Sequence, residues 1–150
     1  MQTFTRPVVS EPGAGRMVYG FGPHQIRMTA EETGGAWGLI ELDMPAGEGP
    51  PLHVHEREDE FFRVLSGRFL FVCDGSETVL EAGGCILLPR GVPHRFQNVG
   101  ADVGRLMVAV TPGGFEGFFA ETDGVGLAEA DAIGLTYGLR FLPALASLAA

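Results

Sequence analysis

The sequence predicts an all-β fold built as a small antiparallel barrel or sandwich, with a short helical segment near the C-terminus. The 23 glycines and 10 prolines among 150 residues would break helices repeatedly, but they suit short strands joined by turns. A hydrophobic share of 45% is enough for the buried core of one domain of this size. Apolar runs fall short of the roughly 18–20 residues that a membrane helix needs.

Proline and glycine punctuate residues 1–24, which we expect to form an N-terminal arm. Between residues 25 and 112, short β-like runs alternate with turn signals such as Asp74-Gly75 and Gly83-Gly84. This segment is the predicted β-barrel. Its expected strands lie in 25–29, 36–43, 51–55, 60–66, 68–74, 77–81, 85–89, 94–99 and 105–111.

Residues 113–150 change character and are expected to form a short helix and an apolar tail, packed on the barrel or on a partner. Phe115, Phe118 and Phe119 follow two glycines at helical spacing. Two interpretations stay open for these rings and are compatible with each other. The helix closes one end of the barrel, or its rings form an aromatic lid over a ligand cavity.

Some expected strands are apolar on both faces, so something must cover their outer side. Along residues 60–66 the alternation places Phe61 and Leu65 on the face opposite Phe62. We therefore expect a homodimer that uses Phe61 and Leu65.

Composition excludes several classes of function. All ten basic residues are arginines, which excludes Schiff-base lysine chemistry and a Walker-type phosphate loop. A net charge of −9 leaves no basic field for nucleic acid or anionic lipid. The N-terminus lacks a cationic head followed by an apolar segment, so we expect a cytoplasmic protein. Cys73 and Cys85 lie in apolar runs and are expected to be buried, reduced thiols.

A candidate metal site begins at His53 and His55. These two histidines are two residues apart on an expected strand, so their side chains project from the same face and can share one ion. After a polar turn, Glu60 begins the next strand and can bring a carboxylate to the same centre. Asp59 is the competing ligand, because a shift of one residue in the turn would exchange it with Glu60. For Glu56 and Glu58 we expect a solvated turn.

The second part of the site follows the turn at Arg90-Gly91. Pro93 and His94 begin the next strand, where His94 shares a face with Phe96 and Asn98. We expect Asn98 to hydrogen-bond the backbone at the end of the strand.

These two blocks resemble the two conserved motifs of the cupins. The first motif, Gly, five residues, His, one, His, four, Glu, six, Gly, is filled by Gly47, His53, His55, Glu60 and Gly67. The second, Gly, five, Pro, one, Gly, two, His, three, Asn, is filled by Gly83, Pro89, Gly91, His94 and Asn98. The resemblance covers about residues 36–112.

The resemblance implies a jelly-roll barrel, also called a double-stranded β-helix, in which His53, His55, Glu60 and His94 bind one divalent metal. Mixed nitrogen and oxygen ligation accepts Fe, Mn, Ni, Co, Cu or Zn. The chain also resembles compact quercetin 2,3-dioxygenase-like proteins. That likeness implies an oxygenase for a small flavonol- or diketone-like substrate, with Glu60 as a proton acceptor. A non-redox isomerase, cyclase or lyase and a non-catalytic small-molecule sensor are the alternatives.

Strand alternation makes Phe62, Phe96 and Met107 candidate apolar walls of the substrate pocket. The remaining expectations concern residues outside the motifs. His24 is expected to be an exposed loop histidine, with the alternative that the N-terminal arm folds over the mouth of the barrel. Trp37 is expected to pack in the core or an interface. Glu41 and Asp43 can supply a second carboxylate to the cavity. Ion pairs at the rim are expected for Arg57, Arg90 and Arg95.

Overall fold

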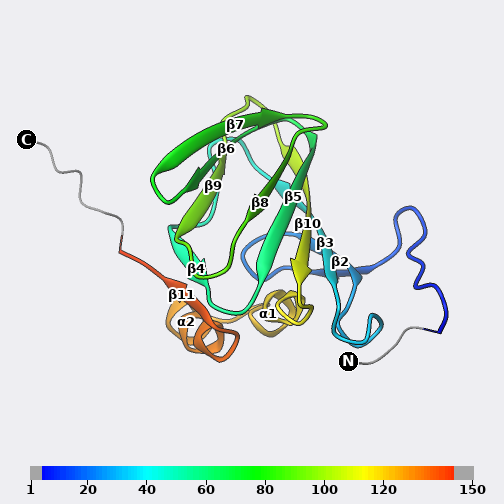
Figure 1. Ribbon diagram of the computed structural model, residues 1–150. Coiled ribbons are helices and arrows are strands. Elements are labelled where there is room, and N and C mark those ends of the chain that lie inside the picture. The colour runs from blue at the N-terminus through cyan, green and yellow to red at the C-terminus, as the bar shows by residue number, and fades with distance from the viewer. Residues whose placement is uncertain (1–4, 144–150) are drawn as a thin grey trace, which may run out of the picture.

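A computed structural model describes residues 5–143, which form two antiparallel sheets facing each other (Figure 1). One sheet contains, in spatial order, β1 (Arg16–Val18), β2 (His24–Met28), β3 (Gly38–Met44), β10 (Gly104–Thr111), β5 (Asp59–Ser66) and β8 (Cys85–Leu88). The other contains β11 (Leu139–Phe141), β4 (His53–His55), β9 (His94–Asn98), β6 (Arg68–Cys73) and β7 (Ser76–Glu81). The predicted all-β jelly-roll class is therefore confirmed.

The strands β2 to β10 coincide, to within one or two residues at their ends, with the nine runs expected from the sequence, while β1 and β11 are additional. β1 pairs with β2, so the first sheet begins inside the segment 1–24 expected to be an arm. β11 pairs with β4, so the chain after residue 112 also contributes to a sheet. Between them, the C-terminal segment forms two helices, α1 (Glu116–Glu121) and α2 (Leu127–Thr136), rather than one. The end of the expected tail, residues 144–150, lies outside the described residues.

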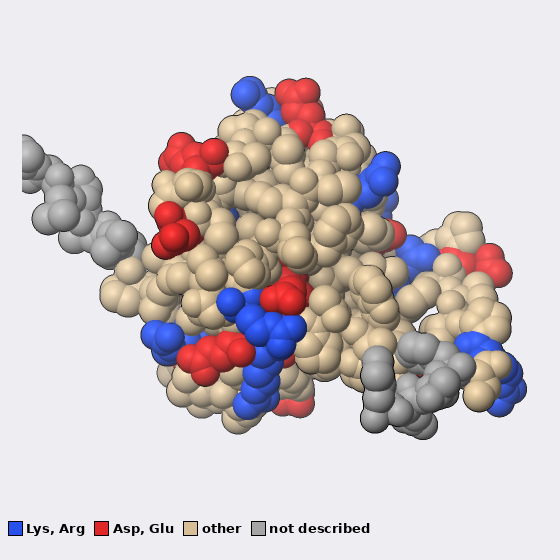
Figure 2. Space-filling model, in the orientation of Figure 1, with Lys and Arg blue, Asp and Glu red and all other residues tan. Residues whose placement is uncertain are grey.

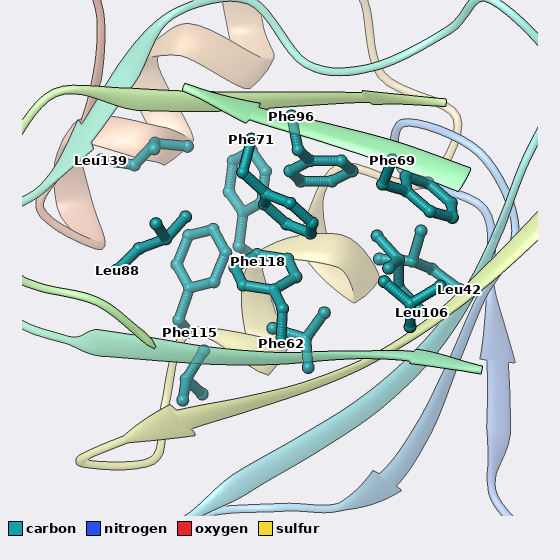
Figure 3. Packing of buried hydrophobic residues seen from close by; sticks show 13 residues of the cluster. Leu42, Phe62, Phe69, Phe71, Leu88, Phe96, Leu106, Phe115, Phe118 and Leu139 are labelled. Carbon is teal, nitrogen blue, oxygen red and sulfur yellow. The ribbon is translucent and has the colours of Figure 1, made fainter. Parts of the chain in front are cut away.

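The core lies between the two sheets, where large aromatic side chains from both meet (Figure 3). Phe62 projects from β5, and its ring lies 5.4 Å from that of Phe71 and 5.2 Å from that of Phe96. Each such ring removes 150–250 Å² from water, at roughly 25 cal/mol per Å². These side chains fill the middle of the space between the sheets, and the histidines lie at one end of it.

The outer faces are less covered than the sequence suggested. Trp37 is 50% exposed, which excludes the core, while its alternative place in an interface stays a prediction. Leu87 of β8 is 59% exposed and lies opposite Phe61 in the β5–β8 register. Leu65 also reaches solvent, while Phe61 is half-buried. The homodimer through this face stays a prediction.

The two cysteines also differ from expectation. Cys73 is half-buried, whereas Cys85 is exposed at the start of the sheet's edge strand β8. The expected burial is wrong for Cys85, because only one neighbouring strand flanks it.

Acidic and basic side chains are interspersed on the face that Figure 2 shows. On the outer surface of β3 and β10, Arg105 pairs with both Glu41 and Asp43. These two acids were candidates for a second carboxylate in the cavity, and that expectation is wrong because the strand directs Ile40 and Leu42 inward instead. Within residues 5–143, no helix is long and apolar enough to cross a membrane.

Candidate metal centre

Two neighbouring strands of the second sheet carry three histidines to one place. His53 of β4 lies directly opposite His94 of β9 in the register. His55 follows on the same strand, and all three residues are buried. The backbone N–H of Gly91 donates to the carbonyl of His55 at 2.7 Å. Gly91 has a φ of +74°, which glycine adopts without strain, so the turn before His94 is fastened to the strand that carries His55.

Backbone carbonyls orient two of these imidazoles. Nδ1 of His53 donates to the carbonyl of Pro51 at 2.7 Å, and Nδ1 of His94 donates to the carbonyl of Val92 at 3.0 Å. A carbonyl accepts only, so each ring carries its proton on Nδ1. In the neutral ring the lone pair is then on Nε2, where a metal ion would replace the proton that Nε2 of His94 shares with Glu60.

Glu60 arrives from β5 in the opposite sheet and completes the group. Its Oε2 lies 2.8 Å from Nε2 of His94, and its Oε1 lies 3.4 Å from Nε2 of His55. One ligand atom from each of the four residues lies within 4.8 Å of the others. The predicted ligands His53, His55, Glu60 and His94 are thus brought together, bridging the two sheets at one end of the core.

The charge states of the carboxylate and the imidazoles in this group depend on one another. Burial alone would raise the pKa of Glu60, but the three imidazoles lower it to about 2, so the carboxylate is ionised at neutral pH. Burial lowers the pKa of His53 to about 4, which keeps its imidazole neutral. Burial acts in the same direction on His55, but the carboxylates of Glu60 and Glu58 outweigh it and raise the pKa of this ring.

Glu58 is buried, which corrects the expectation of a solvated turn. Its side chain is 6% exposed, and Oε2 lies 3.6 Å from Nδ1 of His55. Neither atom has a hydrogen-bond partner among the described residues. Glu56, two residues earlier, is exposed as expected. All residues of this turn are polar, so no local sequence pattern distinguishes the buried carboxylate from its neighbours.

Asp59, the competing ligand, turns away from the centre. Its carboxylate accepts hydrogen bonds from the backbone and the guanidinium of Arg90 at 2.9–3.1 Å, so Arg90 forms the expected ion pair. Arg57 instead donates to the backbone carbonyl of Thr136. In the described part of the chain, Arg95 makes no ion pair. Asn98 behaves as expected, because its amide nitrogen donates to two backbone carbonyls at 2.8 Å.

The metal centre opens onto a cavity of about 190 Å³ with mainly aromatic walls. Phe62 and Phe96, two of the expected pocket residues, line it. Met107 does not, which corrects that expectation. In β10 the side chains of Leu106 and Val108 face inward, and Val108 lines the cavity, whereas Met107 lies between Glu41 and Arg63 on the outer side.

Helix α1 and the residue before it cover the cavity, so both interpretations of the three phenylalanines hold. Phe115, Phe118 and Phe119 all line the cavity, and the helices lie at the end of the sheets near β4 and β5 (Figure 1). The ring of Phe115 meets that of His55 edge-on at 4.3 Å. Phe21, from the N-terminal segment, stacks on Phe118 at 5.5 Å and contributes to the same wall.

His24 also lines the cavity, and its expected exposure is wrong. It begins β2, is 4% exposed, and stacks on Phe119 with ring centres 3.9 Å apart. A sequence signal existed, because Pro23-His24 repeats the Pro93-His94 pair of the metal motif.

The donor set fits a divalent transition metal. Neutral imidazole and carboxylate are its usual ligands in mixed nitrogen and oxygen sites. With three neutral imidazoles and one carboxylate, a divalent site carries a net charge of about +1, and an octahedral ion keeps about two positions free.

The family model described as "Cupin domain" matches residues 40–110. Quercetin 2,3-dioxygenase of Bacillus subtilis (strain 168) is 29% identical over 114 residues, which cover 75% of this chain and 34% of that protein. Polyketide synthase CurC of Streptomyces cyaneus is 33% identical over 85 residues, covering 57% and 54% respectively. The chain thus spans about a third and about half of the lengths of these relatives.

Among solved structures, the cupin domain of Schizosaccharomyces pombe Cnp3 is similar with a TM-score of 0.56. The identity is 19%, and the match covers 63% of this chain and 66% of that one. At this identity the likeness supports the fold alone.

Proposed function

The chain belongs to the cupin superfamily, and on that premise we propose that it is a metal-dependent dioxygenase acting on a small enolic substrate. The metal is one divalent transition ion held by His53, His55, Glu60 and His94. The observation that carries this proposal is the opening of that group onto an apolar, aromatic cavity. The proposal also includes a homodimer and a cytoplasmic location.

The chain provides a water-poor chamber around the centre. Phe62, Phe96 and Phe115 stand beside the ligand residues, where they exclude water and hold a planar substrate by its faces. Oxygenation of an enol needs such a chamber, because reactive intermediates are otherwise lost to water.

Glu60 is the group in the centre that can accept a proton. It is ionised, it lines the cavity, and its two oxygens face different imidazoles. An enolic hydroxyl that approaches the centre meets this carboxylate. Because the pKa of Glu60 is only about 2, Glu60 can take the hydroxyl proton only from an enol that the bound metal acidifies, and its removal leaves the electron-rich enolate that reacts with dioxygen. When bound, the metal supplies Lewis acidity and open coordination positions. Both atoms of dioxygen enter the organic product, so no external reductant is required.

The relative named quercetin 2,3-dioxygenase supports this reaction class, at 29% identity. It supports the class and not the substrate, because the cavity walls here include Phe21, Phe115, Phe118 and Phe119 from outside the matched family segment.

The test is oxygen consumption by Fe-, Mn- and Ni-loaded protein offered flavonols, β-diketones and single-ring hydroxypyranones. We expect uptake with at least one substrate, in equal amount to substrate consumed, and its loss in His94→Ala. Asp59→Asn is the matched control, since this acid lies beside the motif and is bonded to Arg90 instead. No uptake with any metal and substrate, from protein with a full metal site, would overturn the proposal.

A further inference from the structure

His24 and Glu48 are the polar side chains of the cavity that the metal centre leaves unused, and of these two only His24 is buried. It is 4% exposed and shares the cavity with His53, His55 and Glu60. It is not among the four residues whose ligand atoms converge. A buried polar side chain is costly unless it has a partner, so its position in an apolar wall calls for one.

The chain places His24 by the same local structure that places the ligand His94. Each histidine begins a strand directly after a proline, and Nδ1 of each donates to the carbonyl two residues earlier, at 2.9 Å for Gly22 and 3.0 Å for Val92. The residues three positions before them, Phe21 and Gly91, both have positive φ, at 59° and 74°. For Phe21 this conformation is uncommon.

This local structure leaves Nε2 of His24 as an acceptor. Because Nδ1 donates to a carbonyl, the neutral ring has its lone pair on Nε2. Burial lowers the pKa of His24 and keeps the ring neutral. Within residues 5–143, Nε2 makes no hydrogen bond, and it is not among the atoms sealed from solvent.

A wall of aromatic rings connects His24 to the metal centre. The ring of Phe119 stacks on His24 at 3.9 Å, Phe115 lies 5.4 Å from Phe119, and His55 lies 4.3 Å from Phe115. Along this wall, two phenylalanine rings therefore separate His24 from the metal centre.

The size of the cavity limits the ligand. Its volume of about 190 Å³ lies below the range of about 300–1,000 Å³ that is typical of pockets for drug-sized ligands. A single six-membered ring suits this space better than the three rings of a flavonol.

From these observations we infer that His24 is a specificity-determining residue whose Nε2 accepts a hydrogen bond from a hydroxyl group of an uncharged, single-ring substrate. This inference rests on the proposed function, because the opposite end of that substrate must reach the metal. Such a substrate carries an enolic oxygen pair at one end and a hydroxyl at the other.

Kojic acid and allomaltol test this directly. Both are single-ring hydroxypyranones with the same metal-binding oxygen pair, and they differ by one hydroxyl at the far end of the ring. We measure their affinity for Zn-loaded protein by calorimetry, since Zn²⁺ does no redox chemistry. Wild type should bind kojic acid about tenfold more tightly, as one buried hydrogen bond predicts.

In His24→Phe, which keeps the ring and its stacking, the preference should fall to about one with zinc content unchanged. His24→Gln retains an acceptor and should restore part of the preference. Ile40→Val, in the apolar wall, is the matched control and should change both affinities equally. A preference that survives in His24→Phe, or none in wild type, overturns the inference. So does a zinc-replete protein that binds neither probe, whereas failure to take up zinc overturns the metal centre itself.

Discussion

Glu58→Gln should weaken metal binding without destabilising the metal-free protein. Oε2 of Glu58 lies 3.6 Å from Nδ1 of His55, and both atoms are buried without hydrogen-bond partners in the described part of the chain. When Nε2 of His55 binds a cation, the ring's proton stays on Nδ1 and faces this carboxylate. The carboxylate then becomes the acceptor that fixes the ring's orientation and raises its basicity.

The expected loss is about tenfold in affinity, or about 1.4 kcal/mol. Carboxylates behind metal-bound histidines are typically worth 10- to 100-fold. We expect the lower end, because a separation of 3.6 Å exceeds hydrogen-bonding distance and must shorten on metal binding. In the metal-free protein, at a pH high enough to keep His55 neutral, the effect should be absent or opposite, since a buried carboxylate without a hydrogen bond is costly and glutamine carries no charge.

Competition with a chromophoric chelator measures the affinity, and thermal unfolding of the metal-free protein measures stability. Glu56→Gln is the matched control, because Glu56 belongs to the same turn but is exposed, and should change neither quantity. Metal binding by Glu58→Gln as tight as that of wild type would exclude this role of Glu58. A loss of stability in the metal-free variant that parallels the loss of affinity would also exclude it.

Three further predictions concern pH, stability and assembly. Burial lowers the pKa of His53 to about 4, whereas for His55 the adjacent carboxylates outweigh burial and raise the pKa above 6.5. His55 therefore takes up a proton before His53 as the pH falls. The logarithm of the metal affinity, measured by competition titrations, should drop by about one per pH unit from above pH 6.5 and more steeply below about pH 4. A constant affinity between pH 7 and 5 would contradict this. Asn98→Ala should cost about 3 kcal/mol in urea unfolding, because buried backbone groups lose their partners; a cost below about 1 kcal/mol would count against this network. Sedimentation at micromolar concentration should find a dimer that Leu87→Arg dissociates, and a wild-type monomer would exclude the expected interface.

The metal ligands could be predicted from the sequence because their positions depend on local geometry. Two residues along a strand return a side chain to the same face, which places His53 and His55 together. The Pro-Gly turn before His94 and the backbone bonds of Asn98 are equally local. Only the approach of Glu60 to the histidines depends on the two sheets facing each other. This part of the prediction came from the resemblance to the family motif.

The misplaced residues depend on contacts between distant parts of the chain. His24 is buried by a segment far along the sequence, as its stacking on Phe119 shows. For Met107 and Glu41, alternation predicts two faces but does not say which one meets the core. In both strands the apolar neighbours occupy the inner face, since burying them stabilises the fold more than burying a charged or flexible side chain would.

The central claim is that four buried side chains form one metal centre, and metal analysis of protein purified without added metal tests it most directly. Wild type should carry close to one transition-metal ion per chain, and His53→Ala should carry far less while keeping its fold by circular dichroism. Equally little metal in wild type and variant would contradict the account.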